Sequence, residues 1–383
     1  VTARTSAFSF KGQDLPIQEI AAMLGVQHVV EGSVRRSGER LRVTAQLIRA
    51  EDGFHLWSEN YDSTSADMIE VQENIAEKIA SALDVVLDEN KREAMRQAGL
   101  RNPEAFTLYQ KGMDYFERAH GQMDQLEGLR LANGYFEQVM DRVPEYWEVY
   151  ANHSDLYAHL LNDVLTNQFE GNITEEALAE AYRSMLADYE AASQYAPTDR
   201  QRYLAELDLA FLNGNWRGIA GRLEKALADT GCRDGNWTAT VSNVLGYSAE
   251  YSELADKVLA CDPLRSLSWF NASRAKFWAG DAEGALQVAR EGFEVAPGTW
   301  LTMTLLQTLM ANGLHDEAHA VIDDEIQVEG FANVFHVMVE AHRGNPDRLA
   351  PLVDALDLDD RAGGFFLIPV NAWIGRRDAA NAF

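Results

Sequence analysis

The stretch that decides the fold runs from residue 266 to residue 297 and reads SLSWFNASRAKFWAGDAEGALQVAREGFEVAP. Its apolar residues recur at helical spacing on both sides of Gly280, which predicts two short helices joined by a turn. Pro297 then stops the second helix. A single helix pair cannot bury the apolar faces of both helices, so this unit needs similar units beside it.

Glycines at matching positions recur through the second half of the chain, at Gly214, Gly246, Gly280, Gly313, Gly344 and Gly375. Successive members are 32, 34, 33, 31 and 31 residues apart, close to the period of about 34 residues of tetratricopeptide repeats. Within the quoted unit, Trp269, Ala285 and Pro297 have the spacing of that pattern, whereas Lys276 and Ala289 replace its Tyr and Phe. We therefore predict an all-α, superhelical array of divergent tetratricopeptide-like repeats, with about eight helix pairs.

Residues 1–95 differ from this array because strand-like and helix-like stretches alternate in them. Period-two patterns predict strands at 27–36, 41–50 and 54–61, and residues 1–10 also read as a short strand. Helices are expected at 16–24 and from residue 67 to about residue 95. Together these form an α+β domain, an antiparallel meander with helices. We expect this domain at 1–95, divergent helical repeats at 103–197 and tetratricopeptide-like repeats at 198–383.

Four segments of the first 62 residues occur in a familiar order: ARTSAFSFKG at 3–12, EIAAMLGV at 19–26, EGSVRR at 31–36 and AQLIRAEDGFHLWSENYD at 45–62. This pattern resembles the TolB-like N-terminal domain of bacterial multidomain regulators. In that family, tetratricopeptide repeats follow the domain, and a class III nucleotide cyclase or a winged-helix DNA-binding domain often precedes it. An earlier strand and helix of the family are missing here, so the resemblance implies a truncated domain.

The charge of the chain limits its partners. The net charge is −27, and because residues 1–50 carry +3, the other residues carry −30. Nucleic acids and anionic membrane surfaces are polyanions, so neither is expected to contact this chain. No apolar run approaches the roughly 18 residues that span a bilayer. We expect a protein or peptide partner, with a homodimer as an open alternative; the bacterial cytoplasm and the periplasm fit equally well.

The first helices of the repeats would line a concave groove. Taken in register with the glycines, the groove positions carry apolar, aromatic and methionine side chains, which suit adaptable binding surfaces. The alternative is that these residues form ordinary core between repeats. They are Leu267, Phe270, Phe277, Trp300, Met303, Met310, Phe331, Val334 and Met338.

No arrangement of residues indicates catalysis, a metal or a cofactor. His315 and His319 lie four residues apart, but HDEAH lacks the residue order of the zinc-protease motif, and no third ligand is evident. We read them as surface histidines. His153 and His159 are six residues apart and fall on different helix faces. There is no Gly-rich phosphate loop and no nucleophile elbow.

The only two cysteines, Cys232 and Cys261, fall at the start of the first helix and the end of the second helix of one predicted pair. Antiparallel helices bring those ends together, so a disulfide is geometrically feasible and would indicate an oxidising compartment. Two separate thiols are the alternative.

These patterns favour a non-catalytic sensory or regulatory module, in which the repeat array binds a protein or peptide. The resemblance to TolB-like regulators implies a place beside an output domain such as a cyclase. An envelope scaffold or assembly factor without an output domain is the alternative.

Overall fold

The computed structural model describes residues 2–38, 40–64, 67–83, 99–120, 125–165, 174–228, 237–326, 329–344, 349 and 351–353. The chain divides into two compact units, each described by itself. The first holds residues 1–161, 172–229 and 235–241, and the second holds residues 242–383 with two short segments from earlier in the chain.

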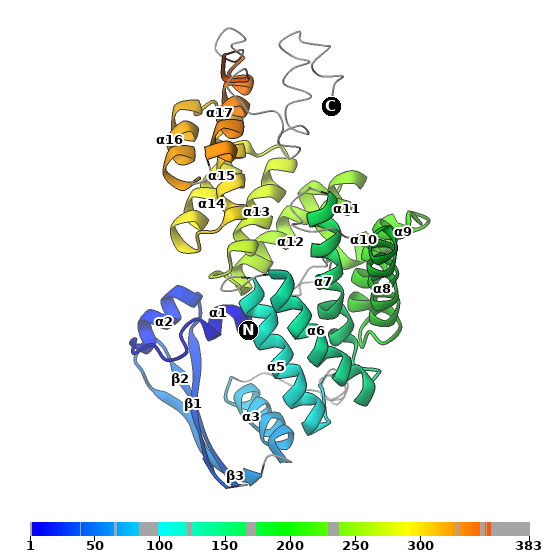
Figure 1. Cartoon of the computed structure of the whole chain (residues 1–383). Helices are drawn as coiled ribbons and strands as arrows, with labels where there is room; N and C mark the ends of the chain where they lie inside the picture. Colours follow the sequence, from blue (N-terminus) through cyan, green and yellow to red (C-terminus); the bar gives the residue numbers. More distant parts are fainter. Residues whose placement is uncertain are drawn as a thin grey trace. The chain divides into compact units, whose positions relative to one another are not determined.

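The first unit begins with a three-stranded antiparallel sheet in the order β1-β2-β3 (Figure 1). The strands are β1 His28–Ser37, β2 Arg40–Arg49 and β3 His55–Thr64. Alternate residues of the central strand, Val43, Ala45 and Leu47, are buried, as expected for a sheet with one covered face. Across β2 and β3, the Arg42 guanidinium donates hydrogen bonds of 2.7 and 2.9 Å to Asp62. The predicted meander is therefore confirmed.

The strand predicted for residues 1–10 is wrong, because Arg4–Phe8 form a short helix, α1. A strand needs a neighbour to satisfy its backbone groups, and within the described part of the chain β1, β2 and β3 pair only with one another. The N-terminal residues use local bonds instead. The Ala7 amide donates to the Ala3 carbonyl at 3.1 Å, and the Ser9 hydroxyl donates to the Ser6 carbonyl at 2.7 Å.

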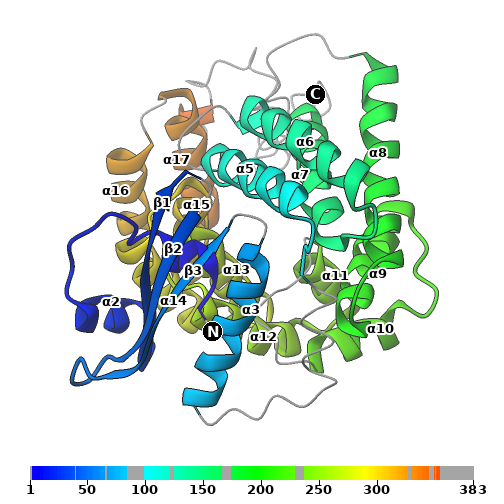
Figure 2. The same ribbon diagram turned by 90° about the horizontal axis from the view of Figure 1, so that it is seen from below.

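Two further helices accompany the sheet. α2, Ile17–Leu24, ends at Gly25, whose φ of 63° lets its amide donate back to the carbonyls of the last turn. α3, Met68–Ala82, packs against β3 (Figure 2). Both helices were predicted; the rest of the second one, which was expected to continue to about residue 95, lies outside the described residues.

The helical part of the first unit begins with Asn102, whose side chain accepts hydrogen bonds from the first amides of α5. The aromatic and aliphatic residues of α5, α6 and α7 share one core, which includes Tyr109, Phe136 and Val149. The helices are α5 Pro103–Ala119, α6 Gln125–Arg142, α7 Trp147–Leu165, α8 Glu175–Gln194, α9 Asp199–Asn213 and α10 Ile219–Ala228.

The second unit continues the succession of helices. A shared core joins α14, α15, α16 and α17, and its buried centre includes Leu306, Leu309 and Ile322. None of the described helices combines the length and the hydropathy needed to cross a membrane. The helices are α12 Ser248–Cys261, α13 Ser266–Trp278, α14 Ala282–Val295, α15 Thr299–Ala311, α16 His315–Glu325 and α17 Glu329–Arg343, preceded by α11 Thr238–Leu245, which contributes to both units.

The repeated glycines end the first helix of successive pairs. Five of them have φ between 69° and 87°, a left-handed conformation that favours glycine: Gly214, Gly246, Gly280, Gly313 and Gly344. After Gly280, the Asp281 amide donates to the Lys276 carbonyl at 2.9 Å, and after Gly313 the Leu314 amide donates to the Leu309 carbonyl at 2.9 Å. These bonds satisfy carbonyls at the helix ends. The predicted helical array is confirmed; Gly375 lies outside the described residues.

Candidate functional site

Two aromatic residues from neighbouring first helices meet at the surface of the second unit. The rings of Phe270, on α13, and Trp300, on α15, have centroids 5.8 Å apart and are tilted by 52°. Trp300 is 56% exposed, and Leu267, three residues before Phe270, is 37% exposed. Residues three apart share a helix face, so Leu267, Phe270 and Trp300 form a continuous apolar surface.

An arginine extends this surface along α13. The Arg274 guanidinium lies 4.6 Å from the ring centroid of Phe270 and 4.4 Å from that of Trp278. These three residues are spaced four apart, so they lie on one helix face, and cation–π attraction holds the charged group between the rings. We call Leu267, Phe270, Arg274, Trp278 and Trp300 the aromatic surface. Sequence reasoning missed Arg274 and Trp278, although their four-residue spacing from Phe270 was a usable signal.

The opposite side of α13 is anchored to its partner helix, which leaves the aromatic surface outward. Trp269 lies so close to α14 that a Cβ on Gly292 would be 2.6 Å from the Trp269 Cβ. The Trp269 indole N–H donates to the Pro263 carbonyl at 2.7 Å, and the Ser273 hydroxyl donates to the Ala285 carbonyl at 2.8 Å. The alternation of large and small residues therefore gives α13 one side packed on α14 and another side that carries the aromatic surface.

The other predicted groove residues lie outside the aromatic surface as defined above. Met310 packs against the core of α14–α17, so we leave it out of the aromatic surface. The side chain of Phe331 lies outside the described residues. The groove as a whole stays a prediction. The remaining members are half-buried: Phe277, Met303, Val334 and Met338.

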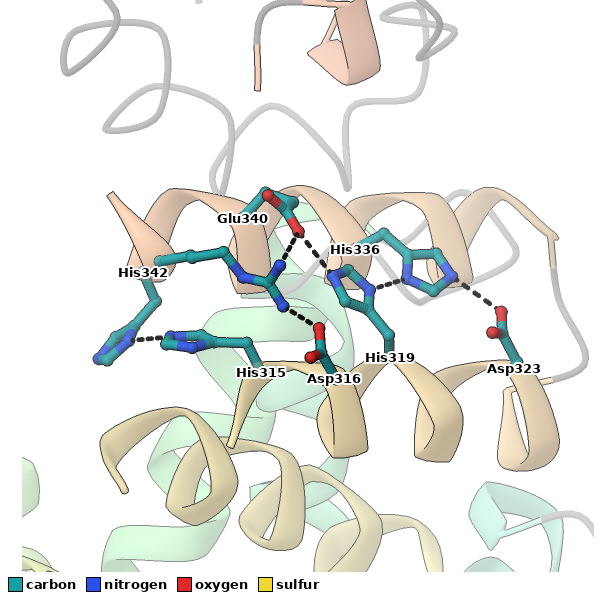
Figure 3. A network of polar contacts seen from close by, with 8 residues as sticks. His315, Asp316, His319, Asp323, His336, Glu340 and His342 are labelled. Atoms are coloured by element: carbon teal, nitrogen blue, oxygen red, sulfur yellow. Dashed lines mark hydrogen bonds and ion pairs between the residues drawn. The ribbon is translucent and has the colours of Figure 1, made fainter. Parts of the chain in front are cut away.

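A polar network joins α16 to α17 (Figure 3). The Nδ1 atoms of His319 and His336 are 2.6 Å apart. On its other side, His319 Nε2 lies 3.0 Å from Glu340 Oε1, and His336 Nε2 lies 3.1 Å from Asp323 Oδ1. The Glu340 side chain is only 6% exposed, so this network is partly shielded from water.

Each histidine of the pair faces the other through Nδ1 and a carboxylate through Nε2. The chain of contacts runs from Glu340 to His319, then to His336 and to Asp323. Because Asp323 and His319 lie on α16 while His336 and Glu340 lie on α17, every contact in this chain crosses between the two helices.

Further polar groups surround the histidine pair. Arg343 contacts both Asp316 and Glu340, and His315 Nε2 lies 3.1 Å from His342 Nδ1. His315 and His319, interpreted from sequence as surface histidines, have partners on α17 that lie 17 to 27 residues later in the chain. These groups border a cavity of about 450 Å³, which is lined by Asp316, His319, Asn333, His336, Glu340, Arg343 and Leu352.

The predicted cysteine pair is only half described. Cys261 is the last residue of α12, where the sequence pattern places it, but Cys232 lies outside the described residues. The disulfide therefore stays a prediction.

Comparison with known proteins gives one partial relative. The putative adenylate cyclase 3 of Rhizobium meliloti (strain 1021) is 41% identical over 108 residues, which are 28% of this chain. The match spans 18% of that relative's length. No family model matches the chain.

Two solved structures cover most of the chain at low similarity. A tetratricopeptide repeat protein from Parabacteroides merdae ATCC 43184 has a TM-score of 0.39 and 10% identity, covering 73% of this chain and 90% of its own. The tetratricopeptide domain of P58(IPK) has a TM-score of 0.21 and 12% identity, covering 72% of this chain and 90% of its own. At TM-scores this low, neither structure indicates a function for this chain.

Proposed function

We propose that this chain is a non-catalytic protein-interaction module of a bacterial signalling protein, and that it binds a protein segment at the aromatic surface. The observation that carries the proposal is the contact between Phe270 and Trp300. Two rings from successive helix pairs meet while more than half of Trp300 remains exposed. Exposed apolar side chains that cluster, rather than occur singly, mark interaction sites.

The chemistry of the surface indicates the kind of partner. Tryptophan and arginine are enriched among residues that dominate binding energy, because they combine large contact area with directional polar groups. A segment with an aromatic or aliphatic anchor would stack on Trp300 and Phe270 and remove their exposed faces from water. Such contacts select a partner segment by the shape of its apolar side chains rather than by one exact sequence.

The signalling context rests on two similarities. Part of the chain is related to a protein named a putative adenylate cyclase, and residues 3–62 resemble TolB-like domains of regulators that carry cyclase or DNA-binding outputs. We infer that the chain serves as the regulatory, partner-binding part of such a protein. In this proposal the polar network of α16 and α17 is structural and joins two helices of the array.

The proposal is tested by capturing partners with the purified chain and then titrating each purified candidate directly. Trp300→Ala and Leu267→Asp should weaken binding by roughly 30-fold or more, as expected for hot-spot residues. Leu314→Asp is the matched control, because Leu314 has the same 37% exposure as Leu267 but lies outside the aromatic surface. Equal affinity of Trp300→Ala and the unmodified chain, with helicity unchanged in both, would reject the aromatic surface as the binding site.

A further inference from the structure

The side chains of three residues of the first unit, two histidines and one aspartate, bring donor atoms typical of metal ligands close together. His120 follows the last residue of α5, while Asp155 and His159 lie four residues apart on α7. His120 Nε2 lies 3.1 Å from Asp155 Oδ2, and His159 Nε2 lies 3.6 Å from the same oxygen. One donor atom from each residue lies within 4.8 Å of the other two.

The hydrogen bonding of His120 determines which of its nitrogens faces Asp155. His120 Nδ1 lies 2.7 Å from the Phe116 carbonyl oxygen, and a carbonyl only accepts, so Nδ1 carries the hydrogen. In the neutral ring, Nε2 then presents a lone pair to Asp155 Oδ2. Two acceptors at 3.1 Å repel each other unless a cation lies between them. The cation is either a second proton on His120 or a metal ion.

The state of Asp155 favours a metal ion. Its Oδ2 is buried and makes no hydrogen bond within the part of the chain that the structure describes, although an imidazole nitrogen is 3.1 Å away. A proton on Nε2 would have to point at that oxygen to form a hydrogen bond. In a metal site, by contrast, the donor atoms point at the ion and not at one another. Two donor atoms can then lie about 3 Å apart without a hydrogen bond between them, because their separation is an edge of the coordination polyhedron.

The distances agree with such a polyhedron. Zinc–nitrogen and zinc–oxygen bonds of roughly 2.0–2.1 Å in a tetrahedron place neighbouring donors about 3.3 Å apart. The two measured nitrogen–oxygen distances, 3.1 and 3.6 Å, lie on either side of this value. The imidazole rings of His120 and His159 are 5.4 Å apart at an angle of 61°, so both can direct a nitrogen at one point.

We propose that His120 Nε2, His159 Nε2 and Asp155 Oδ2 form a binding site for a divalent transition-metal ion of the zinc type. Two imidazoles and one carboxylate suit zinc, cobalt, nickel and iron better than magnesium or calcium. The Phe116 carbonyl orients His120, as second partners of metal-bound histidines do. The Gln125 amide, 3.5 Å from His159 Nε2, offers an oxygen donor when the amide group is flipped.

The position of the site gives it a role in the array. One ligand ends the first helix of the α5/α6 pair, and the other two lie on α7, which follows that pair. A bound ion would therefore join helices of successive pairs. Because the ion binds the folded chain and has no such site in the unfolded one, it stabilises the native state by mass action.

The experiment uses the whole chain after chelator treatment and dialysis. Titration with Co²⁺ should produce the visible absorption bands of a low-symmetry cobalt site, saturating at one ion per chain, and Zn²⁺ should displace the cobalt. His120→Gln, Asp155→Asn and His159→Asn should each weaken binding by at least about tenfold. His120→Gln is the safest variant for folding, because position 120 is exposed.

Two histidine controls distinguish this site from others. His55→Asn removes an exposed histidine on β3, and His319→Asn removes one member of the other histidine pair; both should leave the cobalt spectrum and affinity unchanged. Zn²⁺ should also raise the melting temperature of the unmodified chain but not of His120→Gln. Absence of saturable binding, or binding that survives in all three ligand variants, would overturn the proposal and leave a protonated histidine paired with Asp155.

Discussion

The indole ring of Trp300 lies against the phenyl ring of Phe270, with centroids 5.8 Å apart. The two residues are separated by close to one repeat period, so repetition of the helix pair places them on neighbouring helices. Trp269, next to Phe270 in the chain, faces the other way and packs on Gly292. One helix thus carries one aromatic residue packed on its partner helix and one that belongs to the aromatic surface.

We expect Trp269→Ala and Trp300→Ala to differ in stability. Trp269→Ala should lower the free energy of unfolding by about 2–4 kcal/mol, because it removes a packed ring that also donates to the Pro263 carbonyl. Trp300→Ala should cost less than about 1 kcal/mol, because most of its ring already faces water. Urea unfolding monitored by circular dichroism measures both. Similar losses in the two variants would show that Trp300 is a core residue.

We expect Gly112→Ala and Gly134→Ala to change the stability of the chain in opposite directions. A Cβ on Gly112 would lie 2.5 Å from Phe136 Cε1 in the core shared by α5 and α6, so Gly112→Ala should destabilise the chain by about 1–3 kcal/mol. A Cβ on Gly134, within α6, meets no atom within 4 Å. Gly134→Ala should therefore stabilise the helix by about 0.5–1 kcal/mol. Melting temperatures of the two variants check the prediction, which fails if both move in the same direction.

Asp188 should make stability depend on pH. It lies 2.7 Å from His153, and both residues are buried. Burial raises the pKa of Asp188 above its ordinary value of 3.8, while the hydrogen bond and charge of His153 oppose that rise and the charge of Glu137 adds to it. In the interval between the two pKa values, the folded chain binds a proton that the unfolded chain releases. The stability from this group is therefore present at low pH and falls as pH rises through the raised pKa.

The measurement compares unfolding of the unmodified chain and Asp188→Asn from about pH 4 to pH 7. The asparagine variant lacks this titration, so the stability of the unmodified chain relative to the variant should decline over that interval. A relative stability that increases with pH would mean that the His153 contact, rather than burial, dominates at Asp188.

Cys232 and Cys261 are expected to be joined. Under denaturing, non-reducing conditions, a thiol reagent should label neither cysteine, and reduction should expose both. The bridge would close a loop of about 30 residues, for which the loss of unfolded-state entropy corresponds to roughly 3–4 kcal/mol. Two reactive thiols before reduction would exclude the disulfide. Cys261→Ser, which leaves Cys232 as a single labelled thiol, confirms the assay.

Local sequence patterns were sufficient to predict the repeated helix pairs. A glycine such as Gly280 ends a helix through its own backbone conformation and bonds made within six residues, so its position can be read from local sequence. The alternation in β2 likewise determines which side chains share a face. Residues 1–10 show the limit of this reasoning. Their apolar pattern suits a strand, but among the described residues the strands pair only in the order β1-β2-β3, and Arg4–Phe8 form α1 instead.

The candidate sites could be predicted from sequence only in part, because their contacts form between helices that are far apart in the chain. Phe270 and Trp300 were identified as groove residues because the repeat period relates them, whereas their ring contact with Trp300 exposed is a property of the packed helices. His319 and His336 lie on different helices, and His120, directly after α5, meets Asp155 of α7. No local periodicity relates such pairs.

The amino-acid sequence by itself thus determined where the helices, the turns and the strands lie. These elements depend on side-chain periodicity and on backbone hydrogen bonds that act mostly over a few residues. Packing decided which imidazoles meet a carboxylate and which aromatic rings stay in water. Those outcomes depend on distances of a few ångströms between helices that are far apart in sequence. His120 is an example. Its Nδ1 contacts the Phe116 carbonyl within the same stretch of chain, but its Nε2 faces the Asp155 carboxylate only because α5 and α7 pack together.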